Sequence, residues 1–294
     1  MELDFSGAYT ALVTPFDEAN SIDEKGLVKN IKFQLDRGID GLVPVGTTGE
    51  SPTLTPEEHE LLIEITVKHA KGKARVIAGT GSNNTQEAVH YTKFAEEAGA
   101  DAALVITPYY NKPTQEGLYQ HYKKLSEEVD IPIIIYNVPS RTGRNIDAAT
   151  VLKLAEFDNI VGVKEASCNM DQIMEIIRKA PEGFTMLSGE DSWTYAMLCL
   201  GAHGVISVAS NVAPDAVAEM THKYLEGNVD ASRNIHYKYL DLFGVIFIET
   251  NPSPIKEAMN MMGLAAGKPR LPLVQINEKS KIQLEKVLLD LGLL

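Results

Sequence analysis

The chain has 294 residues, 44% of them hydrophobic and 23% charged, and its 40 acidic and 27 basic residues give a net charge of −13. Such an acidic chain lacks the basic face that a phosphate backbone requires, so its composition excludes a nucleic-acid partner. Two cysteines cannot form the disulfide framework of a small secreted domain, and no apolar run approaches the ~18 residues of a membrane span, so we expect a cytoplasmic globular protein with no membrane partner.

Eight short apolar runs recur along the chain, and a helix-like segment follows each of them. The runs end on average about 28 residues apart, close to the ~30 residues of a strand–helix–strand unit. Most are apolar throughout, which is typical of parallel strands covered by helices. Eight units predict an α/β fold, a (β/α)8 TIM barrel, rather than an open doubly wound sheet of about five or six strands. The predicted strands are Tyr9–Val13, Gly41–Val45, Ala74–Ala78, Ala102–Ile106, Pro132–Tyr136, Ile160–Lys164, Phe184–Ser188 and Gly204–Val208.

Helix signals lie between these runs. Thr55-Pro56-Glu57-Glu58 has the pattern of a capping box with proline at the first helical position, and Asn84 and Gly99 bracket a second helix. The strand pattern stops after Val208, and amphipathic stretches follow at 214–226, 231–248, 254–263 and 278–291. We therefore predict a catalytic barrel over residues 1–224 and a C-terminal helical region over 225–294 that packs on the barrel.

Lys164 is the most informative residue, because it is the only lysine at any of the eight predicted strand ends. In a TIM barrel the chemistry lies at the carboxyl ends of the strands. A lysine in such a low-dielectric place has a lowered pKa, and its neutral amine can attack a carbonyl carbon to form a Schiff base. The competing interpretation is an ion pair with Glu165, Glu190 or a loop carboxylate, and position alone does not decide between them.

Neighbouring strand ends carry groups that imine chemistry needs. Tyr136 could transfer protons, and Thr47 and Tyr110 could extend a chain of hydroxyls from it. Arg141 could hold a substrate carboxylate in a bidentate fork. Taken singly, a strand tyrosine such as Tyr136 is more often a core aromatic, and a loop arginine such as Arg141 is more often a surface ion-pair partner. The glycines, hydroxyls and amides of Gly46-Thr47-Thr48-Gly49 have the pattern of an anion cradle.

Other chemistries lack their motifs. The histidines have no HExxH spacing, the cysteines have no zinc-finger spacing, and the glycine-rich loops lack the dinucleotide fingerprint. We therefore expect an enzyme with no metal and no nucleotide cofactor. Cys168, four residues after Lys164, is interpreted as a buried free thiol.

Four longer segments resemble a known family. They are Gly46-Thr47-Thr48-Gly49-Glu50-Ser51, Thr107-Pro108-Tyr109-Tyr110-Asn111-Lys112-Pro113, Tyr136-Asn137-Val138-Pro139-Ser140-Arg141-Thr142-Gly143 and Val163-Lys164-Glu165-Ala166. These segments are similar to the dihydrodipicolinate synthase family, also called 4-hydroxy-tetrahydrodipicolinate synthase, in the N-acetylneuraminate lyase superfamily. The resemblance extends from Thr14-Pro15-Phe16 to Leu271-Pro272.

The resemblance implies a lyase that condenses pyruvate with L-aspartate 4-semialdehyde in the diaminopimelate route to L-lysine. Lys164 would then form a covalent imine with pyruvate, so that no cofactor is needed, and Tyr136 would transfer protons. Thr47 and Tyr110 would complete the relay, with Tyr110 coming from the adjacent subunit. The substrate-binding residues that the resemblance implies are Thr48, Arg141, Ile206 and Gly189. It also implies a homo-oligomer, expected to be a homotetramer built as a dimer of dimers.

Two alternatives stay open. One is another pyruvate-dependent aldolase of the superfamily, an N-acetylneuraminate lyase or a 2-keto-3-deoxy sugar acid aldolase. Arg141 in the Ser140–Gly143 loop favours the synthase, as does the Tyr109–Tyr110 pair. The other alternative is a catalytically silent barrel that senses a small acid, which the retained catalytic residue types disfavour.

Many members of the family are inhibited by lysine at a dimer-interface site. The matching positions here are Ser51, Pro52, Pro56, His59, Asn83, Glu87 and Tyr109. Lysine-sensitive members commonly carry a polar or basic side chain where this chain has Pro56. Since proline cannot supply that contact, we expect weak or absent inhibition by lysine.

Overall fold

A computed structural model describes residues 4–294, and its central feature is a closed barrel of eight parallel strands in sequential order. The predicted (β/α)8 barrel is therefore confirmed, and each strand begins and ends within two residues of its predicted run. The strands are β1 (Gly7–Ala11), β2 (Gly41–Val43), β3 (Arg75–Gly79), β4 (Ala102–Ile106), β5 (Ile133–Asn137), β6 (Ile160–Glu165), β7 (Thr185–Ser188) and β8 (Gly204–Ser207).

Helices follow the strands as the sequence patterns predicted. Thr55 caps α2 by accepting a hydrogen bond from the Glu58 amide, and the Glu58 carboxylate accepts one from the Thr55 amide. The barrel helices are α1 (Glu24–Leu35), α2 (Pro56–Ala70), α3 (Thr85–Ala98), α4 (Gln115–Glu128), α5 (Pro139–Thr142), α6 (Ala148–Leu154), α7 (Met170–Lys179) and α8 (Thr194–Leu200). Three 3₁₀ turns, η1 (Ser51–Thr53), η2 (Asp191–Trp193) and η3 (Ala209–Asn211), interrupt the loops.

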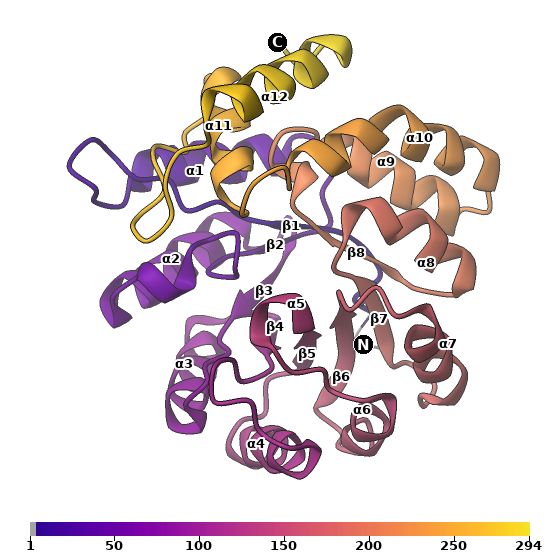
Figure 1. Cartoon of the computed structure of the whole chain (residues 1–294). Coiled ribbons are helices and arrows are strands. Elements are labelled where there is room, and N and C mark those ends of the chain that lie inside the picture. The colour runs from indigo at the N-terminus through magenta and orange to yellow at the C-terminus, as the bar shows by residue number, and fades with distance from the viewer. Residues whose placement is uncertain (1–3) are drawn as a thin grey trace. The chain divides into compact units, whose positions relative to one another are not determined.

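The chain divides into two compact units. The first contains Ile77–Ile206 and the described residues up to Ser6. In it, α3, α4, α6 and α7 cover the outer faces of β4 to β7 (Figure 1). Val105, Ile135 and Val163 belong to the buried cluster that these helices form with the sheet. Side chains alternate between the two faces of a strand. Tyr136 follows Ile135 and Lys164 follows Val163, so both point into the barrel interior.

The second unit contains Gly7–Val76 and Ser207–Leu294. The amphipathic stretches after residue 208 form α9 (Pro214–Leu225), α10 (Val229–Val245), α11 (Ser253–Met261) and α12 (Glu278–Asp290), of which α9 and α10 lie side by side (Figure 1). Asn211 ties this region to β1, since its Nδ2 donates to the Ala11 carbonyl at 2.8 Å. The predicted boundary between residues 224 and 225 stays a prediction. Over residues 4–294, none of the helices combines the length and the apolar character that crossing a membrane requires.

Candidate active site

Lys164 and Tyr136 lie next to each other at the carboxyl ends of β6 and β5. The two residues are register partners in the sheet, and the Lys164 Nζ lies 4.2 Å from the centroid of the Tyr136 ring. Their exposed fractions are only 6% and 7%. The sequence therefore placed the predicted nucleophile and the predicted proton carrier correctly with respect to each other.

The surroundings of Lys164 favour its neutral amine. Burial lowers the pKa of Lys164 to about 7. The negative charges of Asp191 and Glu190 raise this pKa, and the positive charge of Arg141 lowers it, but each of these effects is smaller than that of burial. An ordinary lysine with a pKa of ~10.4 is neutral at pH 7 in only about one molecule in 2,500. The protein therefore raises the neutral fraction by roughly a thousandfold.

The structure does not favour the ion-pair interpretation of Lys164. No carboxylate of residues 4–294 lies within ion-pair distance of its Nζ. Glu165, the nearest candidate in sequence, points to the opposite face of β6, where its carboxylate accepts hydrogen bonds from Asn137 and Gln172. Lys164 is thus a buried amine without a salt bridge, which is the state that nucleophilic attack requires.

Gly189, predicted to bind substrate, lies directly against Lys164. A Cβ at this position would lie 3.1 Å from the Lys164 Cε and 2.8 Å from the Ala166 Cβ. Only glycine lets the backbone pass this close to the lysine side chain. Ile206, the other predicted backbone contact, is buried in β8.

Arg141 lies on α5, the short helix that follows β5. It is exposed, and its positive charge contributes to the lowered pKa of Lys164. This arginine follows Tyr136 as predicted, on a short helix rather than in a loop, and its role in holding a carboxylate stays a prediction.

Tyr110 has an unusual position for a tyrosine. It is 89% exposed, and its backbone is in the left-handed region with φ 69°. Lys112, two residues further on, has φ 46°. The loop after β4 therefore holds an aromatic ring out toward solvent, and the predicted relay through Tyr110 stays a prediction.

In the second unit, the Gly46–Gly49 segment forms a tight turn after β2. The Gly49 amide donates to the Gly46 carbonyl at 3.1 Å, and the Gly49 carbonyl accepts from the Thr14 hydroxyl at 2.7 Å. Val45 and Glu50 flank the turn with φ of 50° and 57°. A left-handed β-branched residue such as Val45 is a true backbone outlier, and strain of this kind clusters at functional loops.

Thr48 is buried, whereas Thr47 is half-buried. The Asn251 Nδ2 donates to the Thr48 Oγ1 at 3.0 Å. Sequence reasoning missed Asn251 because it lies 203 residues from Thr48 and belongs to no motif of the loop.

The residues that match the lysine site lie in both units. Ser51 and Pro52 belong to η1, Pro56 is the exposed first residue of α2, and His59 is buried on the same helix. In the first unit, the Glu87 carboxylate accepts hydrogen bonds from Ser82 at 2.7 Å and Asn84 at 3.3 Å, while Asn83 and Tyr109 are half-buried. Glu87 is therefore engaged within its own loop.

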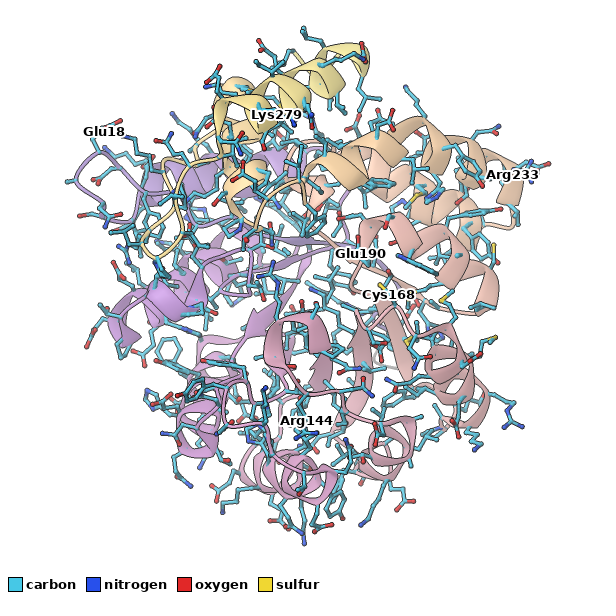
Figure 2. The ribbon with its side chains drawn as sticks, in the orientation of Figure 1. Glu18, Arg144, Cys168, Glu190, Arg233 and Lys279 are labelled. Carbon is cyan, nitrogen blue, oxygen red and sulfur yellow. The ribbon has the colours of Figure 1, made fainter. Side chains whose placement is uncertain are left out.

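Cys168 is exposed, so its interpretation as a buried thiol is wrong. It has φ 56° and lies near Glu190 (Figure 2). Partial desolvation of the sulfur and the charges of Glu190 and Glu165 raise the pKa of its thiol. Cys168 is therefore a poor nucleophile at neutral pH.

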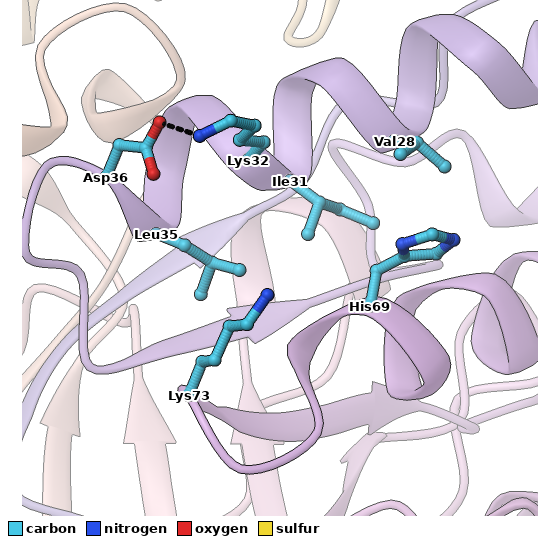
Figure 3. Close-up of a pocket in the computed structure, with 7 residues that line it drawn as sticks. All are labelled: Val28, Ile31, Lys32, Leu35, Asp36, His69 and Lys73. Carbon is cyan, nitrogen blue, oxygen red and sulfur yellow. Dashed lines mark hydrogen bonds and ion pairs between the residues drawn. The ribbon is translucent and has the colours of Figure 1, made fainter.

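A cavity of about 360 Å³ lies between α1 and α2 (Figure 3). Apolar side chains form part of its wall, and Lys32 and Asp36 form an ion pair at its edge. Its lining residues are Val28, Ile31, Lys32, Leu35, Asp36, His69 and Lys73, and none of them is a predicted site residue.

Comparison with known proteins identifies the family of the chain. Residues 4–291 match the Dihydrodipicolinate synthetase family. A 4-hydroxy-tetrahydrodipicolinate synthase from Archaeoglobus fulgidus is 52% identical over 290 residues, which cover 99% of both chains. The crystal structure of dihydrodipicolinate synthase from Aquifex aeolicus has a TM-score of 0.96 and 53% identity over 98% of this chain and 99% of that one. A structure of the enzyme from Cyanidioschyzon merolae with lysine bound has a TM-score of 0.96 and 39% identity over 99% of both chains. The chain therefore belongs to the dihydrodipicolinate synthetase family.

Proposed function

We propose that the protein is a 4-hydroxy-tetrahydrodipicolinate synthase, a lyase that condenses pyruvate with L-aspartate 4-semialdehyde in the diaminopimelate route to L-lysine. The observation that carries the proposal is the buried, unpaired Lys164 amine with its pKa near 7 beside Tyr136. The names of relatives that are about half identical over the full chain support the choice of substrates.

The chemistry begins at the Lys164 Nζ. The neutral amine attacks the keto carbon of pyruvate, and loss of one water from the carbinolamine gives an imine, so no further cofactor is needed. Loss of a proton from the pyruvate methyl group gives an enamine, whose carbon attacks the aldehyde of the second substrate. The amino group of that substrate then attacks the imine carbon and displaces the Lys164 nitrogen, which closes the ring and returns the free amine. Tyr136 transfers the protons at these steps.

The substrates are anions, and the proposed contacts suit their carboxylates. Because the Thr48 Oγ1 accepts a hydrogen bond from Asn251, the hydroxyl hydrogen of Thr48 is free to donate to the carboxylate of pyruvate. Arg141 holds the carboxylate of the semialdehyde, and Ile206 and Gly189 contact pyruvate through their backbone.

The relay from Tyr136 continues through Thr47 to Tyr110 of an adjacent subunit. The exposed ring of Tyr110 supports this assignment, since an aromatic side chain held in solvent gains by burial against another chain. The assembly is a homotetramer made of two dimers, and it works in the cytoplasm.

The choice of second substrate is tested by comparing aldehydes with pyruvate fixed. We expect aspartate semialdehyde to be used with a kcat/KM at least ~100-fold higher than that of sugar-acid aldehydes, because a site built around a charged hydrogen-bond donor rejects substrates that lack its partner. A coupled assay measures both rates. A preference for sugar-acid aldehydes would favour the other aldolases of the superfamily, and no turnover with any aldehyde would favour the sensor.

The rate of imine formation is expected to rise with pH and to reach half its maximum near pH 7. Only the neutral amine attacks, and protonation of Lys164 below its lowered pKa removes that form. Rapid quenching with borohydride at intervals, from pH 5.5 to 8.5, measures the trapped fraction. A rate that still increases tenfold per pH unit at pH 8.5 would contradict the lowered pKa.

Lysine is expected to inhibit the protein weakly or not at all. Pro56 begins α2 with no side-chain donor or acceptor to offer the ligand, and the Glu87 carboxylate is engaged by Ser82 and Asn84. Initial rates measured from zero to 10 mM lysine, ~10⁴ times a micromolar inhibitor's Kd, check this expectation. Half-inhibition at sub-millimolar lysine would overturn it, and Pro56→His is the variant in which sensitivity is expected to increase.

A further inference from the structure

A buried polar network lies behind the Lys164–Tyr136 pair, on the other face of the same two strands. Asn137 follows Tyr136 and Glu165 follows Lys164, and Asn137 and Glu165 are register partners in turn. Because strand side chains alternate between faces, Asn137 and Glu165 point away from the barrel interior. Their exposed fractions are 0% and 1%. The network therefore joins β5 and β6 one residue beyond the pair that performs the chemistry.

Glu165 is the centre of this network. Its carboxylate accepts four hydrogen bonds: one from the Asn137 Nδ2 to each oxygen at 3.0 Å, one from the Ser167 amide at 2.7 Å and one from the Gln172 Nε2 at 2.9 Å. All of these partners are donors. Only a group with two acceptor oxygens satisfies them together, and a glutamine would turn one acceptor into a donor.

The same network reaches the loop that carries Arg141. The Asn137 Nδ2 donates to the Asn145 Oδ1 at 2.8 Å, and the Asn137 Oδ1 accepts from the Ile146 amide at 3.2 Å. The Gln172 Nε2 donates to the Ile146 carbonyl at 3.2 Å. Asn145 and Ile146 lie where the chain returns from α5 to α6, so this end of the loop is fastened to the partners of Glu165.

We propose that Glu165 is a positioning residue that holds Lys164, Tyr136 and the Arg141 loop in one arrangement. Through Asn137 it fastens β5 to β6 beside the reacting pair and to the end of the loop, and through Gln172 it fastens the loop a second time. The inference rests on the proposed function, which gives those three residues their roles. A misplacement of about 1 Å at reacting groups is enough to lower a rate a hundredfold. The hydrogen bonds of Glu165 fix the strand one residue from the Lys164 amine, so their loss is expected to affect catalysis directly.

Two substitutions distinguish the contact of Glu165 with Asn137 from its contact with Gln172. We expect Glu165→Gln to lower kcat at least tenfold and to slow the trapping of pyruvate on Lys164 by a similar factor, because an amide donor then faces the donors of Asn137 or Gln172. We expect Gln172→Ala, which keeps Glu165 and its bond to Asn137, to raise the KM for aspartate semialdehyde at least fivefold with pyruvate trapping within twofold of the parent. A general loss of stability would not slow pyruvate trapping in one variant and raise only the KM for the semialdehyde in the other.

Asn137→Ala and Asn159→Ala form a matched pair. Asn159 directly precedes β6 at its amino end, where its Nδ2 donates to the Ser126 carbonyl at 3.1 Å and the Val129 carbonyl at 2.8 Å. Both variants lose side-chain hydrogen bonds and are expected to lower Tm. Only Asn137→Ala is expected to lower kcat and the trapping rate tenfold, and Asn159→Ala should leave both within twofold.

Three results would overturn the proposal. They are unchanged trapping in folded Glu165→Gln or Asn137→Ala, an equal loss of kcat in Asn159→Ala, and an unchanged KM for the semialdehyde in Gln172→Ala. The last of these decides the question even where Glu165→Gln does not fold. A parent protein that traps no pyruvate would instead overturn the proposed function and this inference with it.

Discussion

Lys164→Ala is expected to abolish the borohydride-trapped adduct of pyruvate and to lower the condensation rate by more than ~10³-fold, because the only nucleophile of the imine pathway is lost. Mass spectrometry of the parent after treatment with pyruvate and borohydride should show one pyruvate-sized adduct, on Lys164. The fold should survive, since removal of a buried amine without a salt bridge leaves no carboxylate unpaired.

Two further variants show that the effect is specific. Tyr136→Phe keeps the amine, so the adduct should still form while turnover falls by roughly 10²–10⁴-fold, the usual contribution of a positioned proton carrier. Lys179→Ala removes an exposed lysine that pairs with Glu175 at 2.6 Å, and both adduct and rate should stay unchanged. An adduct on another lysine, or full activity in Lys164→Ala, would refute the imine assignment.

Lys256→Met is expected to have the largest effect on stability, about 3–5 kcal/mol, which is the usual cost of leaving one member of a buried ion pair without its partner. The Lys256 Nζ lies 2.6 Å from the Glu50 Oε1, and the two side chains are 1% and 0% exposed. The ammonium also donates to the carbonyls of Thr14 and Lys268, each at 3.1 Å. Burial lowers the pKa of Lys256, and the Glu50 carboxylate opposes that shift.

Urea unfolding of Lys256→Met measures this loss, and two controls interpret it. Lys286→Met makes the same substitution at an exposed lysine that pairs with Asp290, and it should leave the free energy of unfolding nearly unchanged. Lys256→Met/Glu50→Gln should regain part of the loss, because the unpaired carboxylate is then removed as well. A loss below ~1 kcal/mol in Lys256→Met would contradict the buried pair.

The same pair adjoins the turn that carries Thr48, the residue proposed to bind the carboxylate of pyruvate. Glu50 follows the Gly46–Gly49 turn directly, and its second oxygen accepts from the Arg270 amide at 2.8 Å. Lys256 and Arg270 thus hold the left-handed residue that ends the turn carrying Thr48. In Lys256→Met that remains folded, the KM for pyruvate is therefore expected to increase, by about fivefold or more, a cost near 1 kcal/mol.

Several parts of the site could be predicted because local pattern and strand position are enough to find them. The apolar runs defined the strands. Tyr136 and Lys164 end two successive runs, and in a barrel the ends of successive parallel strands lie side by side at the face where chemistry occurs. The capping box of α2 followed from residue types at fixed short spacings. For Cys168 the same reasoning failed, because burial of a loop residue depends on backbone geometry such as its positive φ.

By itself, the sequence determined the barrel, the order of its elements and the positions of Lys164 and Tyr136 at adjacent strand ends, because hydrophobic period and strand ends are properties of local sequence. Only the tertiary structure decided whether Lys164 has a salt bridge, since Glu165 finds Asn137 and Gln172 on the opposite face. It alone paired Glu50 with Lys256, 206 residues away, and Thr48 with Asn251, 203 residues away. Such partners share no spacing or period, because hydrogen-bond geometry and burial select them only once the chain has folded.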